Sequence, residues 1–288
     1  MINWLKQNYH TYKVTGQIPA FFAIIGPYHL LALIGIIAAY FTWSWYYLVY
    51  FVLGYVVFGG IGDAVILHRH LSHNSVALRP RLKPLLYWIA CITGQGSPIW
   101  WAALHRGYHH AYSDKEKDLH SPMKGKWSAY MGWMLAITHD TVNLKYAATL
   151  LRDKHLIFFH KHYNKVIWAT LAVIFTINPM FCLWFVVIPC VFALHSENAV
   201  NLLCHLTNFG YRNFDTKDMS QNVWFLGFFS WGQGWHNNHH SCPKSFDFGT
   251  TVSKIRYEFD PCMLLLPLVA PRSESKRIWK NWREQCVG

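Results

Sequence analysis

Histidine is the residue type that most clearly brings chemistry to this sequence. The chain has 18 His, more than its 14 Asp and Glu together. Nine of them stand in three short segments, HRHLSH (68–73), HRGYHH (105–110) and HNNHH (236–240). Neutral imidazole is a common ligand for iron, zinc and copper. The segments therefore predict a metal site with nitrogen ligands.

The spacing within these segments can place several ligands on one side of a helix. Residues at i, i+3 and i+4 share a helical face, and this relates His236 to His239 and His240, and His105 to His109. His68 and His73 are about 140° apart on an ideal helix. These two can share a metal only if the helix ends or bends there, or if the metal lies between them.

The composition indicates that these ligands belong to a membrane protein. Hydrophobic residues make up 53% of the chain and charged residues 14%, whereas about a quarter of a soluble domain is charged. This argues against a simple water-soluble enzyme. The apolar runs approach the length that a bilayer requires. We predict an all-α membrane protein with four transmembrane helices in two hairpins, at about residues 20–41, 43–62, 163–178 and 179–196.

The remaining segments, 63–162 and 197–288, are predicted to form a cytosolic helical cap that carries the metal site. Residues 1–288 then make one domain. A fifth apolar stretch, 85–104, contains Gly and Pro residues and ends in a Trp pair, so we expect it to be buried or interfacial rather than spanning. The second hairpin should turn at Asn178-Pro179, where a helix must stop.

The basic residues predict the orientation of the chain. None of the 26 Lys and Arg residues lies in either hairpin turn, so by the positive-inside rule both termini and both long segments are cytoplasmic. The net charge of +12 favours an anionic bilayer surface or a phosphate-bearing partner. No compact basic element indicates nucleic acid. The expected location is a bacterial inner membrane.

Taken together, the motifs resemble those of the membrane fatty-acyl desaturases. The three segments are similar to the histidine boxes of the acyl-CoA type that forms a cis double bond at the ninth carbon, the stearoyl-CoA desaturases. The stretch GYRNFDTKDMSQNVWFLGFFSWGQGWHNNHH is also similar to that family, as are WWAALHR, SDKEKDLHSP and KGKWSAYMGWML. The resemblance covers about residues 20–265 and includes an Asn-x-x-x-His pair, Asn201 and His205.

This resemblance implies a dinuclear Fe²⁺ centre and an O₂-dependent desaturase of acyl-CoA or acyl-lipid. The implied ligands are His68, His73, His105, His109, His110, His205, His236, His239 and His240, with Asn201 acting through a water molecule. A fatty acyl hydroxylase of the same superfamily is the alternative. A His-rich metal transporter is more remote, because it predicts ligands within the spans near the middle of the bilayer.

Further residues are assigned to the substrate or to the surroundings of the ligands. The candidates for the acyl chain and its polar head are Gln95, Trp100, Trp101, Arg69, Arg106, Lys124 and Lys126, with a solvated or lipid-facing basic surface as the other explanation of the cations. His70, His120 and His195 are candidates for positions behind the ligands. For His195 a hydrogen bond inside the bundle is the simpler explanation.

Electrons are expected to come from a separate protein. The sequence has no dinucleotide-binding fingerprint, no ferredoxin-type cysteine set and no cytochrome-like segment after the third box. We therefore expect a ferredoxin or a cytochrome b5-like donor together with its reductase.

The second box departs from the family pattern. The acyl-CoA type has two residues between the first His and the His pair, whereas here Arg106, Gly107 and Tyr108 make three. Either His105 ligates from position i, i+4 with a rotated helix, or the extra residue forms a π-bulge, which Gly107 would ease. We favour the bulge, because it keeps both flanking helical registers.

Overall fold

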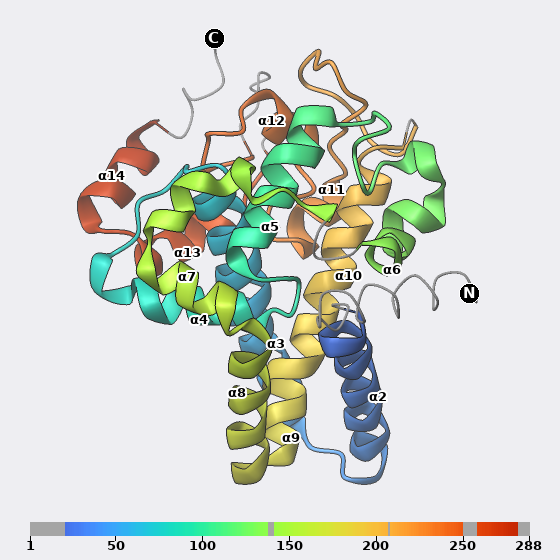
Figure 1. Cartoon of the computed structure of the whole chain (residues 1–288), viewed down its shortest axis with the longest axis vertical. Helices are drawn as coiled ribbons and strands as arrows, with labels where there is room; N and C mark the ends of the chain where they lie inside the picture. Colours follow the sequence, from blue (N-terminus) through green and yellow to red (C-terminus); the bar gives the residue numbers. More distant parts are fainter. Residues whose placement is uncertain (1–20, 138–140, 207, 250–257, 282–288) are drawn as a thin grey trace.

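A computed structural model of the chain describes residues 21–137, 141–206, 208–249 and 258–281. Two elements in the described part that lie far apart in sequence, α2 (Gly26–Phe41) and α8 (Tyr163–Ile177), lie on either side of the helix that runs from η9 (Cys182–Val187) into α10 (Ile188–Leu203). Together they form a narrow stalk below a wide helical head (Figure 1). No strand occurs among the described residues, which contain only two isolated β-bridges. The all-α prediction is therefore confirmed for this part of the chain.

Among the described residues, three continuous helices are long and apolar enough to cross a membrane: Phe22–Phe41, Trp45–Ser72 and Pro179–Leu203. The fourth predicted span corresponds to the apolar helix Tyr163–Ile177, whose 15 residues are fewer than the about 20 that a span requires. Residue 20, where the first span was predicted to begin, and both chain termini lie outside the described residues.

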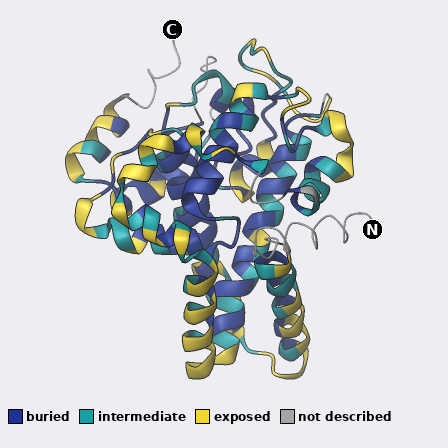
Figure 2. Cartoon of the chain, in the orientation of Figure 1, coloured by how far each residue is buried: buried dark blue, intermediate teal, exposed yellow. Residues whose placement is uncertain are grey.

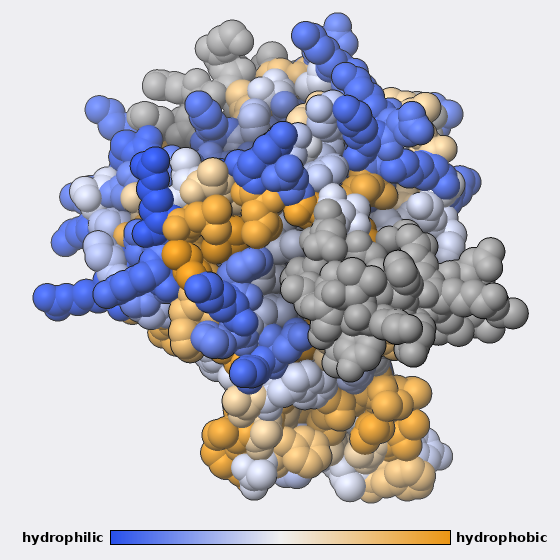
Figure 3. Space-filling view, in the orientation of Figure 1, coloured by the Kyte–Doolittle hydropathy of each residue, from blue (hydrophilic) through white to orange (hydrophobic). Residues whose placement is uncertain are grey.

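The stalk carries its apolar side chains on the outside. Leu33, Ile37 and Val52 are more than half exposed, and the lower end of the molecule is mainly hydrophobic at its surface (Figure 3). Large apolar surfaces of this kind mark contacts with a membrane or with another protein. In the interior of the head, by contrast, most residues are buried (Figure 2).

Both turns at the foot of the stalk are made by polar side chains. The Ser44 hydroxyl accepts a hydrogen bond from the backbone N–H of Tyr46 at the start of α3 (Trp45–Gly54). The Asn178 side chain accepts one from Phe181 N–H, and Pro179 stands at the first position of the short helix α9 (Pro179–Phe181). The predicted break at Asn178-Pro179 is confirmed, and its cause is this N-cap.

Two helices extend from the stalk into the head further than predicted. The helix that begins as α3 continues as the π-helix η2 (Tyr55–Ser72), ten residues beyond the predicted end at residue 62. α10 runs to Leu203, beyond the predicted end at residue 196, after the π-helix η9 (Cys182–Val187). These extensions carry the first histidine box and Asn201 into the head.

Short helices build the rest of the head. They are η3 (Pro80–Leu82), α4 (Lys83–Ile92), α5 (Pro98–Leu104), η4 (His105–His110), η5 (Pro122–Lys124), η6 (Ser128–Gly132), α6 (Trp133–Ala136), η8 (Leu144–Arg152), α7 (Lys154–Lys161), α11 (Trp224–Phe229), α12 (His236–Ser241), α13 (Cys262–Val269) and α14 (Arg272–Asn281). The π-helix η1 (Phe21–Ile25) instead runs directly into α2 and is part of the first span. α4 and α5 cover the predicted fifth apolar stretch, and both tryptophans at its end are buried.

Arg69 holds the end of η2 to the segments before α13. Its guanidinium lies 2.7 Å from the Asp260 carboxylate and 3.8 Å from the centre of the Phe248 ring, and it donates to the carbonyls of Ala64 and Phe246. The side chain is fully buried. The prediction that Arg69 contacts a substrate phosphate was therefore wrong, because all of these contacts are internal.

Candidate metal centre

The nine predicted histidines meet in two groups inside the head. The first imidazole group contains His68, His73, His105, His110 and His239, and the second contains His109, His205, His236 and His240. Within each group one ring nitrogen of every residue lies within 4.8 Å of the others. Each group draws its members from segments that are far apart in sequence.

In the first imidazole group, the Nε2 atoms point at one another. The Nε2 atoms of His68 and His110 each lie 3.0 Å from Nε2 of His239, and those of His73 and His105 are 2.9 Å apart. His68 and His239 are completely buried. These two imidazoles are therefore shielded from solvent.

The π-helical winding of η2 explains how His68 and His73 reach the same group. The backbone N–H of His73 donates to the carbonyl of His68 at 3.2 Å, which is an i to i+5 bond. Their ring centres are 5.0 Å apart. The angular separation expected for an ideal α-helix thus becomes much smaller, because one wider turn brings residue i+5 close to residue i.

The second box is also wound as a π-helix. Its residues form the π-helix η4, so the predicted π-helical segment is present and the regular i, i+4 alternative was wrong. His105 pairs with His110, five residues on, at 4.6 Å between ring centres. His109 belongs to the second imidazole group instead. Gly107 packs against the ring of Tyr146, where a larger side chain would collide.

The third box lies between the two groups. His236 and His240, at positions i and i+4 of α12, belong to the second imidazole group, with Nε2 atoms 3.1 Å apart. His239 belongs to the first. The helical face predicted for the three histidines therefore does not lead them to a single site, because one short helix contributes to both groups.

Every member of the second imidazole group has its Nδ1 atom next to an acceptor. The partners are Asp118 for His109 at 3.3 Å, Asp114 for His205 at 3.1 Å, Asp218 for His240 at 2.8 Å and the Gln233 carbonyl for His236 at 3.1 Å. These acceptors place the ring proton on Nδ1 and leave the lone pair on Nε2. The four lone pairs therefore point toward a common centre.

This arrangement fits a metal ion. The Nε2 atom of His240 lies 3.2 Å from that of His109 and 3.1 Å from that of His236. Lone pairs at this distance repel one another unless a cation lies between them. Two nitrogen ligands at right angles, each about 2.0 to 2.1 Å from a metal, are themselves about 3 Å apart. The observed spacing matches that geometry, and the all-nitrogen donor set suits iron, zinc or copper.

Burial keeps these imidazoles neutral. Loss of solvation lowers the pKa of His73, His105, His110, His236 and His239 well below the usual value. Burial also lowers the pKa of His240, to about 4. For Asp218 burial acts in the upward direction, but hydrogen bonding from His240 outweighs it and the pKa is lowered. The result is a neutral imidazole oriented by a carboxylate, which is the form that binds a metal.

Four acceptors were missed by the sequence analysis: Asp114, Asp118, Asp218 and Gln233, whose Oε1 atom lies 2.5 Å from Nδ1 of His68. All four stand in stretches that carried the resemblance, SDKEKDLHSP and the long stretch before the third box. Polar residues next to a histidine box were the available signal.

The other predicted polar residues have different surroundings. Asn201 is buried on α10, where it lines a small cavity together with His105 and His120. The His120 ring lies 4.6 Å from that of His109, behind the second imidazole group.

His70 hydrogen-bonds the Val76 carbonyl and Tyr87. His195 bonds His29 and Tyr130. Neither belongs to the two groups.

The predicted substrate residues divide into buried and exposed sets. Trp101 stacks on His105 with ring centres 4.9 Å apart, and its indole N–H points to Gln95 Oε1 at 3.4 Å. Trp100 is buried beside it. Arg106 donates to the carbonyls of Leu71 and Ser72 at the end of η2. Lys124 and Lys126 are exposed.

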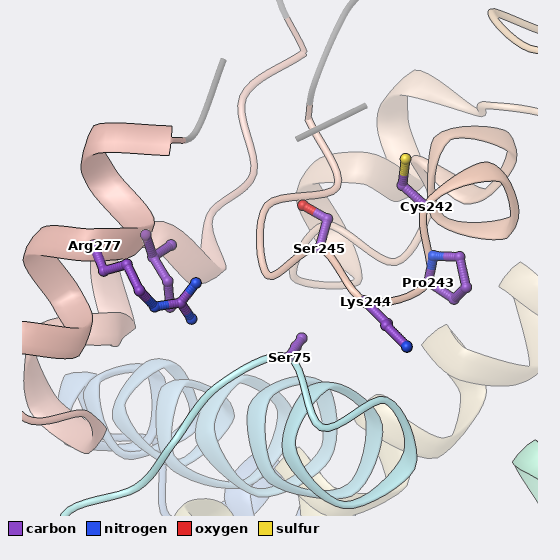
Figure 4. A pocket seen from close by; sticks show the side chains of 7 residues that line it. Ser75, Cys242, Pro243, Lys244, Ser245 and Arg277 are labelled. Atoms are coloured by element: carbon purple, nitrogen blue, oxygen red, sulfur yellow. The ribbon is translucent and has the colours of Figure 1, made fainter. Parts of the chain in front are cut away.

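A separate groove of about 370 Å³ lies on the surface between the loop after α12 and α14 (Figure 4). Its lining includes Ser75, Cys242, Lys244 and Arg277. It contains none of the nine clustered histidines.

The fold and the site define a class of protein, a helical membrane protein with a histidine-rich centre in its head. Residues 42–248 match the family model described as fatty acid desaturase. The chain is 34% identical to Delta-9 acyl-lipid desaturase 2 of Arabidopsis thaliana, over 75% of this chain and 69% of that protein. It is 31% identical to an acyl-CoA 5-desaturase of Anemone leveillei, over 78% of this chain and 70% of that protein.

A third relative is the sn-1 stearoyl-lipid 9-desaturase of Synechocystis sp., which is 30% identical over 77% of this chain and 69% of that protein. The chain therefore belongs to the fatty acid desaturase family. It is an oxidoreductase of the membrane, and its histidine clusters are able to bind metal.

Proposed function

We propose that each imidazole group binds one iron ion and that the protein inserts a cis double bond at the ninth carbon of a saturated acyl chain. The observation that carries this proposal is the convergence of Nε2 lone pairs in two adjacent groups. Asn201 is proposed to act through a water molecule. Bound iron would reduce O₂ and remove hydrogen from an unactivated methylene group.

The residues of the chain hold and shield this centre. Asp114, Asp118 and Asp218 keep the protons of their histidine partners on Nδ1, so the ligands need no reorganisation when metal binds. Trp101, stacked on His105, forms an apolar wall against the first imidazole group. Such a wall excludes water from the bound methylene groups.

The substrate is proposed to be an acyl-CoA or an acyl-lipid. The relatives carry both kinds of name, and their names also include positions other than the ninth carbon. Trp100, Trp101 and Gln95 are proposed to contact the acyl chain. Trp101 stacks on His105, Gln95 accepts from its indole N–H, and Trp100 is the buried residue before it in the chain. Arg106, Lys124 and Lys126 remain candidates for the polar head.

Electrons are proposed to come from a ferredoxin or a cytochrome b5-like donor with its reductase. Both termini are proposed to be cytoplasmic, because basic residues are absent from both hairpin turns. The four-span topology is retained on the same basis, with Tyr163–Ile177 as a short fourth span.

The test is expression in a host that lacks its own desaturase, followed by analysis of the fatty acids and of the double-bond position. We expect cis-monounsaturated chains with the double bond at the ninth carbon, and none from a His109→Ala variant. A hydroxylated chain without a double bond would assign the protein to the hydroxylases. A saturated profile alongside normal protein levels and a supplied electron donor would refute the proposal.

A further inference from the structure

A small cavity adjoins both imidazole groups. Its lining includes His105 of the first group and His120, which lies behind His109 of the second. The cavity lies between α5, α6 and α10 and has a volume of about 30 Å³. A cavity of this size holds roughly two water molecules.

Four buried polar atoms in this lining make no hydrogen bond among the described residues: Gln95 Nε2, His120 Nδ1, Trp133 Nε1 and Glu197 Oε2. The side chains of Gln95 and Glu197 are more than nine-tenths buried. Unsatisfied buried polar groups cost free energy and usually have an ordered water as their partner. Four of them around one small space indicate that the cavity is hydrated.

Glu197 is the carboxyl group of this lining, and it is not isolated. The Asp63 carboxyl on η2 is close enough to interact with it, and the Gln233 side chain approaches both. Because Gln233 Oε1 faces Nδ1 of His68 at 2.5 Å, the NH₂ end of the amide faces the carboxyls. Gln233 therefore lies between His68 and this acid pair.

The proposed reaction consumes protons that the acyl chain does not supply. Converting –CH₂–CH₂– and O₂ into –CH=CH– and two H₂O takes two hydrogen atoms from the chain, two electrons from the donor and two protons from the solvent. His105 and His109 are only 5% and 1% exposed. Protons therefore need a route through the protein to the space between the groups.

We propose that Glu197, acting through water in this cavity, delivers the protons consumed when O₂ is reduced. A carboxyl group can release a proton and take another from water, whereas the amides of Gln95 and Asn198 and the indole of Trp133 cannot. Each proton that Glu197 releases is replaced from solvent through the cavity water. Glu197 acts through water and is thus a proton-relay residue. This inference rests on the proposed desaturase function.

The test uses the iron-loaded enzyme and the variant Glu197→Gln, which keeps the shape of the side chain and removes its exchangeable proton. We expect kcat to fall by about 100-fold or more, with the iron content and the KM for the acyl substrate unchanged. The solvent deuterium isotope effect on kcat should become larger. Glu197→Asp should recover most of the activity. The matched control, Glu116→Gln on an exposed loop, should behave as the wild type.

A second measurement is independent of turnover. In the metal-free protein, infrared spectra should contain a carboxylic acid band that shifts in D₂O and is missing from Glu197→Gln. Wild-type kcat and isotope effect in Glu197→Gln would overturn the inference. A raised KM alone would also overturn it, because the cavity would then bind a polar group of the acyl chain, and loss of iron would make the role structural. If the wild type forms no double bond while the infrared band is present, the proposed function is what fails.

Discussion

In the second imidazole group, three of the four histidines are oriented by a carboxylate and the fourth by a backbone carbonyl. A histidine that ligates a metal through Nε2 must carry its proton on Nδ1, and a hydrogen-bond acceptor fixes that tautomer. The short 2.8 Å contact between Asp218 and His240 is the clearest case. These carboxylates therefore fix the metal-binding tautomer of their histidine partners in the metal-free protein.

Replacing Asp218 with Asn therefore tests the site at this scale. A neutral amide favours the proton on Nδ1 of His240 less strongly than the carboxylate does. We therefore expect the iron affinity of the second group to fall by about 10- to 100-fold. Titration with a competing chelator measures this. Asp215→Asn is the matched control, because the Asp215 side chain is fully exposed in the same loop. Equal affinities in the two variants would contradict the orienting role.

Arg69 offers a test of stability. Replacing it with Met leaves the Asp260 carboxylate buried without its cation, and breaking a buried ion pair in this way costs about 3–5 kcal/mol. Arg277→Met removes an exposed pair with Glu274 and should cost at most about 1 kcal/mol. Thermal unfolding of the metal-free proteins in detergent compares the two. A loss for Arg69→Met no larger than for Arg277→Met would refute the structural assignment.

At the scale of the elements, the π-helices decide which histidines meet. The sequence predicted the nine histidines and a bulge in the second box, because residue types and one extra residue are visible in the chain. It did not predict that His68 and His73 would pair through an i to i+5 turn, because η2 follows an apolar helix without any local break. Nor did it predict that α12 would contribute histidines to both groups. That outcome depends on which other segments pack against the two sides of the helix.

The burial of Arg69 shows the same limit of sequence reasoning. A cation inside a histidine box suggested a surface role, and only the fold brings Asp260, almost 200 residues later, against it. Three of the four predicted spans correspond to helices long enough to cross a membrane, and two of these, Trp45–Ser72 and Pro179–Leu203, continue beyond their predicted ends because apolar composition ends before the helix does.

Gly107 provides the test of the π-helix η4. A Cβ atom at this position would meet the Tyr146 ring, so Gly107→Ala should destabilise the protein by about 1–3 kcal/mol through overpacking. The iron content of the first imidazole group should fall with it, because His105 and His110 flank the distorted turn. Gly132→Ala is the control, since its Cβ would come no closer than 3.2 Å to Trp127, whereas a Cβ at Gly107 would come much closer to the Tyr146 ring. Equal unfolding temperatures for the two variants would show that η4 tolerates the change.

At the scale of the whole molecule, the narrow apolar stalk and the wide polar head predict how the protein sits in a membrane (Figures 1 and 3). The histidine groups lie in the head, and the uncharged turn at Ser44 lies at the far end of the stalk. A reporter inserted at Gly125 should therefore report the cytoplasm, and one inserted near Ser44 the opposite side. Both positions are exposed or half-buried. A non-cytoplasmic signal at Gly125 would overturn the orientation.

The central claim is that two separate imidazole groups each hold one iron ion, and iron stoichiometry tests it most directly. Metal analysis of the purified active protein should give close to two irons per chain. His236→Ala, in the second imidazole group, and His73→Ala, in the first, should each reduce this to about one, with both variants still inserted in the membrane. Two irons retained in both variants, or full activity of the wild type with a single iron, would contradict the account.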